Sequence, residues 1–300
     1  MKFGNKIFLS ALFVLTFTFS AFAQQASVQI PRESPRAELI QYVGDTRMAI
    51  VYHRPSIKGR EVWGKLVPFG EIWRAGANEN TTFEVSENVK VNGQDLPAGK
   101  YGLHIIPTKD EWTIIFSKKN DEWGSFTYKP ENDALRVKAK PDTRPNSMES
   151  LMYEFEAVTP TTSTVVVRWE KLRVPFTVEV TDVQNRVLGR LRQQIAGMTD
   201  VTKAQPYVGS RMTAANFVVD NKIKSAYADA ATWIDEALKV REAFNTLRGK
   251  ARISAEMGNF KDAVTYGDKA VTVGKAAKPT VNADLMANFE KDLATWKTKQ

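Results

Sequence analysis

Apolar and polar residues alternate over short stretches between Arg47 and Val180. In Glu111–Ser117 the apolar positions are Trp112, Ile114 and Phe116, the two-residue period of a strand with one buried face. Short alternating strands with turn residues between them predict an antiparallel sandwich or barrel rather than a parallel sheet. The other expected strands are Met48–Tyr52, Val89–Val91, Gln94–Leu96, Lys100–Ile106, Ala134–Ala139, Met148–Val158, Ser163–Trp169 and Leu172–Val180.

One turn in this region is predicted in detail. Asn92-Gly93 separates two short strand patterns, and both central residues of a tight hairpin turn need positive φ, which Asn and Gly adopt readily. We therefore expect a hairpin there.

The period changes after Thr181. From Val183 to Ile195 the apolar residues recur at helical spacing. A loop containing Gly197, Pro206 and Gly209 is expected to follow.

A weak repeat then appears in the chain. Ser225–Ala230 aligns with Gly258–Ala263, and Ala237 aligns with Ala270, each at an offset of 33 residues. This pattern resembles tetratricopeptide repeats, whose period is about 34 residues, although Gly267 replaces a large apolar residue of that pattern. A plain helical bundle is the alternative. The repeats are expected to pack on the β-region or on a final helix ending near Trp296.

Together these patterns predict an α+β protein with segregated domains. Residues 28–181 are expected to form an all-β, jelly-roll-like sandwich, and residues 183–300 a helical, tetratricopeptide-like region.

The first residues have the pattern of a signal peptide. Lys2 and Lys6 precede an apolar run from Ile7 to Phe19, and Ala21-Phe22-Ala23 is a small-x-small cleavage site. An uncleaved anchor is the alternative, but the run is short for a membrane span. We expect residues 1–23 to be removed, leaving a periplasmic or secreted protein with no membrane span.

The composition of the chain excludes several kinds of functional site. The chain has no cysteine, which excludes disulfides, thiolate metal sites and cysteine nucleophiles. Most of the net charge of +8 lies after residue 183, where the basic residues are scattered along helices rather than clustered. Such scatter is typical of solvated helix faces, so we expect no nucleic-acid partner.

The β-region resembles a known family. Its segments SPRAELIQYVG, VYHRPSIKGREVWGKLVPFGEIWRAGANENTTFE, VNGQDLPAGKYGLHIIP and EWTIIFSKKNDEWGSFTY are similar to the bacterial exported proteins grouped as domain of unknown function 2911. The resemblance covers most of residues 34–180 and implies an exported β-domain, often followed by helical repeats. It implies no activity and no catalytic residue.

A polar stretch interrupts two strand ends between Glu71 and Glu84. Trp73, Arg74, Asn78 and Glu79 offer an aromatic face, a guanidinium, an amide and a carboxylate, which suit recognition of sugar hydroxyls or a carboxylate. The alternative is structural, with an Arg74–Glu79 ion pair locking the connection and Asn78 in a turn.

His53 and His104 are the two histidines. If their strands are neighbours, they could meet Glu79 in a two-histidine, one-carboxylate metal site. No HxH or HExxH pattern supports this, so the favoured interpretation is a pair of histidines on strand surfaces with their hydrogen bonds satisfied, and we expect neither metal nor cofactor.

Two functions are compatible with these residues. The favoured one is a non-enzymatic module of the bacterial cell envelope that binds a small polar ligand or carbohydrate, with a protein partner as a further role for the helices. The alternative is a hydrolase of an envelope or extracellular polymer, with Glu79 and His104 as acid–base residues. No recognised catalytic motif supports an enzyme.

Overall fold

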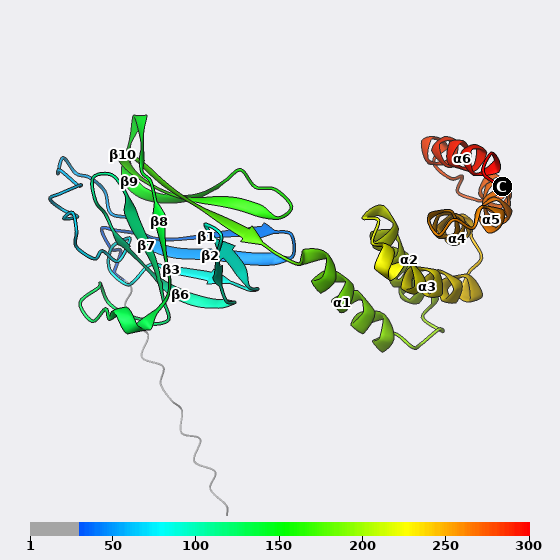
Figure 1. The fold of residues 1–300 in the computed structure, drawn as a ribbon, viewed down its shortest axis with the longest axis horizontal. Helices are drawn as coiled ribbons and strands as arrows, with labels where there is room; N and C mark the ends of the chain where they lie inside the picture. Colours follow the sequence, from blue (N-terminus) through cyan, green and yellow to red (C-terminus); the bar gives the residue numbers. More distant parts are fainter. Residues whose placement is uncertain (1–29) are drawn as a thin grey trace, which may run out of the picture.

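The computed structural model describes residues 30–300, which form a β-sandwich followed by a set of helices (Figure 1). The predicted signal peptide lies outside the described residues. Within residues 30–300, no helix combines the length and the apolar character that crossing a membrane requires.

The strands form two antiparallel sheets, and this confirms the expected fold class. The six-stranded sheet has the order β1 (Arg36–Val43), β2 (Thr46–His53), β3 (Thr82–Val85), β6 (Gly99–Ile106), β7 (Trp112–Ser117) and β8 (Asp133–Ala139). The four-stranded sheet has the order β5 (Gln94–Leu96), β4 (Val89–Val91), β10 (Thr162–Val180) and β9 (Asp142–Glu156). A short 3-10 helix, η1 (Pro130–Asn132), precedes β8.

The two sheets share one core. Phe83 and Phe116 from the six-stranded sheet lie with ring centroids 6.1 and 5.8 Å from that of Phe176 in β10. All three side chains are fully buried. The alternation seen in the sequence therefore places one face of each strand in this core.

Two features of the sheets differ from the expected strands. β1 was not predicted, because it is an edge strand whose side chains are mostly exposed or half-buried. β10 runs unbroken through the gap expected between Trp169 and Leu172. A register shift there, with Glu170 at φ 49°, bends the strand instead of ending it.

The helical region begins where the sequence predicts it. It comprises α1 (Val183–Gly197), α2 (Ala204–Asp220), η2 (Lys224–Ala226), α3 (Tyr227–Val240), α4 (Phe244–Glu256), α5 (Phe260–Ala276) and α6 (Ala283–Lys297).

The expected loop around Pro206 and Gly209 is wrong, because both residues belong to α2. Pro206 lies in the first turn, where a missing backbone N–H breaks no helical hydrogen bond. The rest of α2 is held by packing, with Ala214, Ala215 and Val218 fully buried.

The repeated small residues lie at helix contacts. Ala230, Ala237, Ala263 and Ala270 have no exposed surface. A Cβ on Gly267 would lie 2.5 Å from Leu293 Cδ1 of α6. The final helix therefore occupies the space left by the missing large residue, and α6 is where the repeats end.

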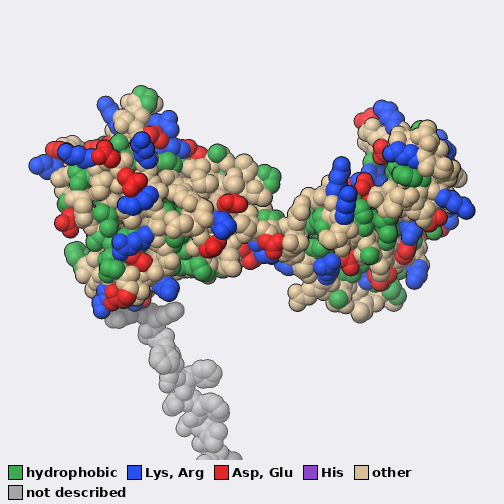
Figure 2. Space-filling view, in the orientation of Figure 1, with side chains coloured by type: hydrophobic (Ala, Val, Ile, Leu, Met, Phe, Trp, Pro, Cys, Tyr) green, Lys and Arg blue, Asp and Glu red, His purple; other side chains and the backbone are tan. Residues whose placement is uncertain are grey.

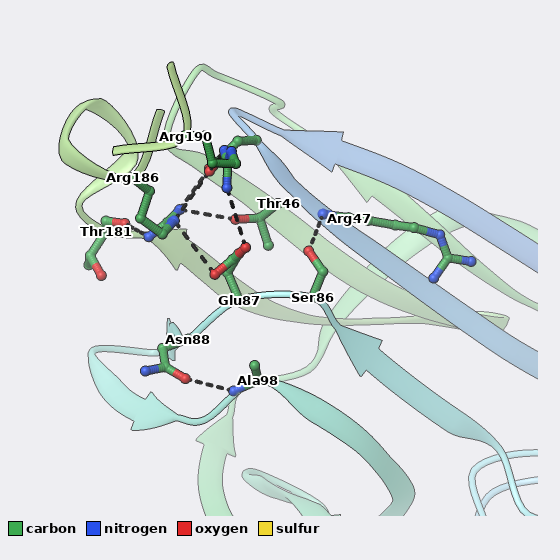
Figure 3. Close-up of polar contacts among 10 residues, drawn as sticks. Thr46, Arg47, Ser86, Glu87, Asn88, Ala98, Thr181, Arg186 and Arg190 are labelled. Carbon is green, nitrogen blue, oxygen red and sulfur yellow. Dashed lines mark hydrogen bonds and ion pairs between the residues drawn. The ribbon is translucent and has the colours of Figure 1, made fainter. Parts of the chain in front are cut away.

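α1 joins the two bodies through a narrow waist (Figures 1 and 2). Arg186 donates hydrogen bonds to Asp45 at 2.7 and 3.2 Å and to Thr46 at 3.3 Å (Figure 3). Arg190 pairs with Asp45, and its second guanidinium nitrogen lies 3.6 Å from Glu87. Burial alone would raise the pKa of Asp45, but the bonds from both arginines outweigh it and lower the pKa. These ion pairs anchor α1 to the turn between β1 and β2.

Candidate ligand-binding site

A hollow of about 1150 Å³ lies on the outer face of the six-stranded sheet. Val51 and Thr82 line it, whereas their chain neighbours Ile50 and Phe83 point into the core. The N-terminal segment 30–36 and residues 120–122 supply further walls. Residues far apart in sequence therefore meet at this hollow.

Gly102 of β6 makes room for one of these walls. A Cβ on Gly102 would lie 2.2 Å from Asn80 Oδ1 and 2.3 Å from the Lys119 carbonyl oxygen. Only glycine allows the segment after β7 to lie this close to β6.

An ion pair and a histidine are part of the lining of the hollow. Arg32 donates from Nη1 to both Glu79 carboxylate oxygens, at 2.7 and 2.6 Å. His53 Nε2 lies 3.3 Å from Glu79 Oε2. Hydrogen bonding by Arg32 holds the pKa of the Glu79 carboxyl below its usual value. Burial lowers the pKa of His53, although the Glu79 carboxylate opposes this. His53 is therefore a neutral neighbour of a charged carboxylate at pH 7.

A second histidine–carboxylate pair is buried. His104 has no exposed surface. Its Nδ1 lies 2.9 Å from Ser125 Oγ, and its Nε2 lies 3.9 Å from Glu122 Oε2. Glu122 Oε1 accepts a hydrogen bond of 2.6 Å from Thr127. Burial lowers the pKa of His104, so this imidazole is also neutral at pH 7.

The ring of Tyr128 lies beside His104. The Tyr128 ring centroid lies 5.0 Å from that of His104. The Tyr128 hydroxyl donates to Asp133 at 2.8 Å and accepts from Arg136 at 2.6 Å. Burial, reinforced by the bond to Asp133, raises the pKa of Tyr128 to about 12. The hydrogen bond to Asp133 connects Tyr128 to the start of β8, and the neighbouring Thr127 bonds Glu122.

The structure separates the predicted site residues into groups. His53 and Glu79 line the hollow, while His104 is fully buried and faces Glu122. Trp73 does not line the hollow, because its backbone pairs with Ile105 and its ring packs against Trp63 and Trp169.

Arg74 and Asn78 support the site from behind. Asn78 adopts φ 56° and donates a hydrogen bond to the Ser34 carbonyl oxygen at 3.2 Å. The structural alternative of an Arg74–Glu79 lock is wrong, since Glu79 pairs with Arg32. Within residues 30–300 the buried Nε of Arg74 has no hydrogen-bond partner, and burial lowers the pKa of this guanidinium.

The histidines do not converge on one carboxylate. His53 meets Glu79 and His104 meets Glu122. In the described part of the chain, no three His, Asp or Glu side chains are placed to hold a metal ion. The two-histidine, one-carboxylate arrangement considered from the sequence is therefore not formed.

Several lining residues escaped the sequence analysis, among them Arg32, Arg36, Lys100 and Glu122. Each is an ordinary charged residue in its local context, so no motif singles it out. Trp123 was missed as well. This residue is 55% exposed, and its backbone forms an isolated bridge with Glu79 outside the two sheets.

One comparison with known proteins gives a match. A family model described as a protein of unknown function (DUF2911) matches residues 34–178. This part of the chain belongs to that family. The match covers the sandwich, including β1 through most of β10, and stops before α1. Searches of the curated proteins and of the solved structures gave no match.

Proposed function

We propose that this member of the DUF2911 family is a binding module whose hollow takes a small polar ligand or carbohydrate. The observation that carries the proposal is the hollow itself, with Arg32, Glu79 and His53 in its lining and the exposed Trp123 next to Glu79. A concave site with a few convergent polar groups is the usual form of a small-molecule site.

The location of the protein is part of the proposal. The pattern of residues 1–23 supports export from a bacterial cell. A periplasmic or secreted binding module would meet sugars, peptides and carboxylates of the cell envelope.

The geometry favours binding over hydrolysis. The hydrolase hypothesis needs Glu79 and His104 at one substrate, but His104 is fully buried and its neighbouring carboxylate is Glu122. A general acid or base must come within hydrogen-bond reach of the substrate.

A thermal-shift screen of residues 24–300 tests the proposal. The panel contains neutral sugars, amino sugars, short peptides and carboxylates. A ligand at ten times its Kd stabilises the folded state by about 1.4 kcal/mol, which raises Tm by roughly 3–6 °C for a body of this size.

Two variants make the screen specific to the hollow. Val51→Trp places an indole ring in the hollow and should abolish the shift, whereas Val158→Trp, on an exposed residue that does not line the hollow, should retain it. A panel without any shift, or a shift that survives Val51→Trp in a folded protein, refutes the proposal.

A further inference from the structure

The segment Ile30–Pro35, here called the strap, runs along the hollow. Ser34 accepts a hydrogen bond from Asn78 Nδ2 at 3.2 Å, and the Pro35 carbonyl oxygen accepts from the Arg54 N–H at 3.0 Å. These two contacts hold the C-terminal end of the strap close to Glu79, two residues after Arg32.

The Arg32 guanidinium is bound by two groups. Its Nη1 bonds both oxygens of Glu79, and its central carbon lies 5.7 Å from the centroid of the Trp123 ring. A carboxylate beside an aromatic face is a common way to bind an organic cation.

The rest of the chain holds this carboxylate and this indole together. Glu79 and Trp123 form an isolated backbone bridge, the Gly124 N–H donates to the Asn78 carbonyl oxygen at 3.3 Å, and the Asn80 N–H donates to the Glu122 carbonyl oxygen at 2.9 Å. None of these bonds involves the strap. The pair therefore exists whether or not Arg32 occupies it.

Arg32 is easy to displace. The Arg32 and Glu79 side chains are 49% and 45% exposed, and exposed ion pairs contribute little because water and salt screen them. Trp123 presents an even larger exposed surface. His53, the other neighbour of Glu79, is neutral at pH 7 because burial lowers its pKa, so it does not repel a cation.

We propose that Glu79 and Trp123 form a cation subsite for an ammonium or guanidinium group of the ligand, and that Arg32 occupies this subsite until the ligand displaces it. This inference rests on the proposed function and specifies which end of the ligand meets Glu79. Amino sugars and arginine-containing peptides are two sources of such a group.

Isothermal titration of residues 24–300 tests the subsite with matched probes. Glucosamine is compared with N-acetylglucosamine, and N-acetyl-arginine amide with its neutral citrulline analogue. In at least one pair, the cationic probe should have a Kd about ten-fold or more below that of its neutral partner. The reason is that the neutral probe lacks the charged hydrogen bond to Glu79. The pair that shows the difference identifies the source.

Variants separate the roles of the three residues. Arg32→Ala should tighten binding of the cationic probe about two- to five-fold, because it removes a competitor held by an exposed ion pair. Glu79→Gln should weaken binding about ten-fold or more, and Trp123→Ala should weaken it roughly two- to five-fold. Arg144→Ala is the matched control. It removes an arginine from a similarly exposed ion pair, with Asp142, that does not line the hollow, so binding should change less than two-fold.

Equal binding of cationic and neutral probes would overturn the inference and leave the proposed hollow intact. Weaker binding of the cationic probe by Arg32→Ala, with the Tm of the variant unchanged, would also overturn the inference, because it would mean that Arg32 contacts the ligand instead of competing with it. Failure of the whole panel to bind would instead remove the proposed function itself.

Discussion

The sandwich and the helical region bury their apolar residues in different ways. The sandwich has one core shared by both sheets, with Trp112, Trp169, Phe83, Phe116 and Phe176 almost completely buried. The helices contain two smaller clusters, in which alanines occupy many of the closest contacts.

This difference separates two sources of stability. In the sandwich, residues distant in sequence must all be in place before the core is formed. In the helical region, each helix packs mainly on its neighbours in the chain, as in repeat proteins whose stability is a sum of local terms. We therefore expect the two bodies to unfold separately, and each prediction below tests that comparison.

The largest effect is expected from Trp169→Ala. Trp169 is 2% exposed and its ring packs on Trp63 and Trp73 at 5.8 and 6.0 Å. Deleting such a ring costs about 3–5 kcal/mol, so the sandwich should melt early while the helices remain folded. Near-ultraviolet circular dichroism follows mainly the sandwich, which holds five of the seven tryptophans, and the 222 nm signal follows the helices. Loss of both signals in a single transition would show one cooperative unit.

A helix contact is tested by Ala237→Leu. Ala237 in α3 has no exposed surface, and added volume in a tight contact costs about 1–3 kcal/mol. The 222 nm transition should move to lower denaturant concentration and the near-ultraviolet transition should not. Ala228→Leu, on an exposed position of the same helix, is the control and should leave both transitions in place.

The pH dependence of stability should be confined to the sandwich near neutral pH. Both histidines lie in that body, and burial sets the pKa of His104 below its unfolded value of 6.5. The unfolded chain therefore takes up a proton first as the pH falls below 6.5, and the sandwich loses stability until the folded pKa is reached. The slope from one such group is at most about 1.4 kcal/mol per pH unit.

His104→Gln should flatten this slope between pH 7 and 5. Denaturant midpoints of the sandwich at the two pH values measure it. An unchanged slope in the variant would assign the effect to His53, and His53→Gln provides that comparison.

The smallest effect is expected at the waist. Asp45→Asn removes the carboxylate that binds Arg186 and Arg190. The cost should be about 1 kcal/mol, because both arginines are partly exposed and keep Glu87 as a second partner. The two bodies should then vary more in relative position, which small-angle scattering detects as a broader distance distribution.

Low pH should also broaden the distance distribution of the wild-type chain. The folded pKa of Asp45 lies below its ordinary value of 3.8, so the anchor is complete above pH 3.8 and is lost as the pH falls through the folded pKa. Asp45→Asn should show no such change over that range. A wild-type distribution that is equally broad at pH 7 would mean that α1 is not anchored.

The sequence alone determined the local features of this protein. The Asn92-Gly93 turn has φ values of 46° and 80° as expected, because a two-residue hairpin admits few residue types. The change from strand to helix period at residues 181–183, the repeated alanines and the start of α1 at Val183 were also predictable. Apart from the repeat, which is recognised at an offset of 33 residues, these features depend on residues only a few positions apart.

Local patterns also explain why β1 was missed and why a loop was expected at Pro206. The exposed edge strand β1 has no long apolar alternation, and Pro206 signals a break although it occupies the first turn of a helix. In both places the tertiary packing overrides a weak local signal.

Only the tertiary structure decided the composition of the candidate site. Whether Glu79 pairs with Arg74 or with Arg32, 47 residues away, depends on where the chain folds back on itself. Trp73 was predicted near a ligand but is half-buried and packs against the core, while Trp123 is exposed. The physical reason is that the local sequence does not specify which partner a charged or aromatic side chain will contact. Their partners are selected by the packing of strands that are distant along the chain.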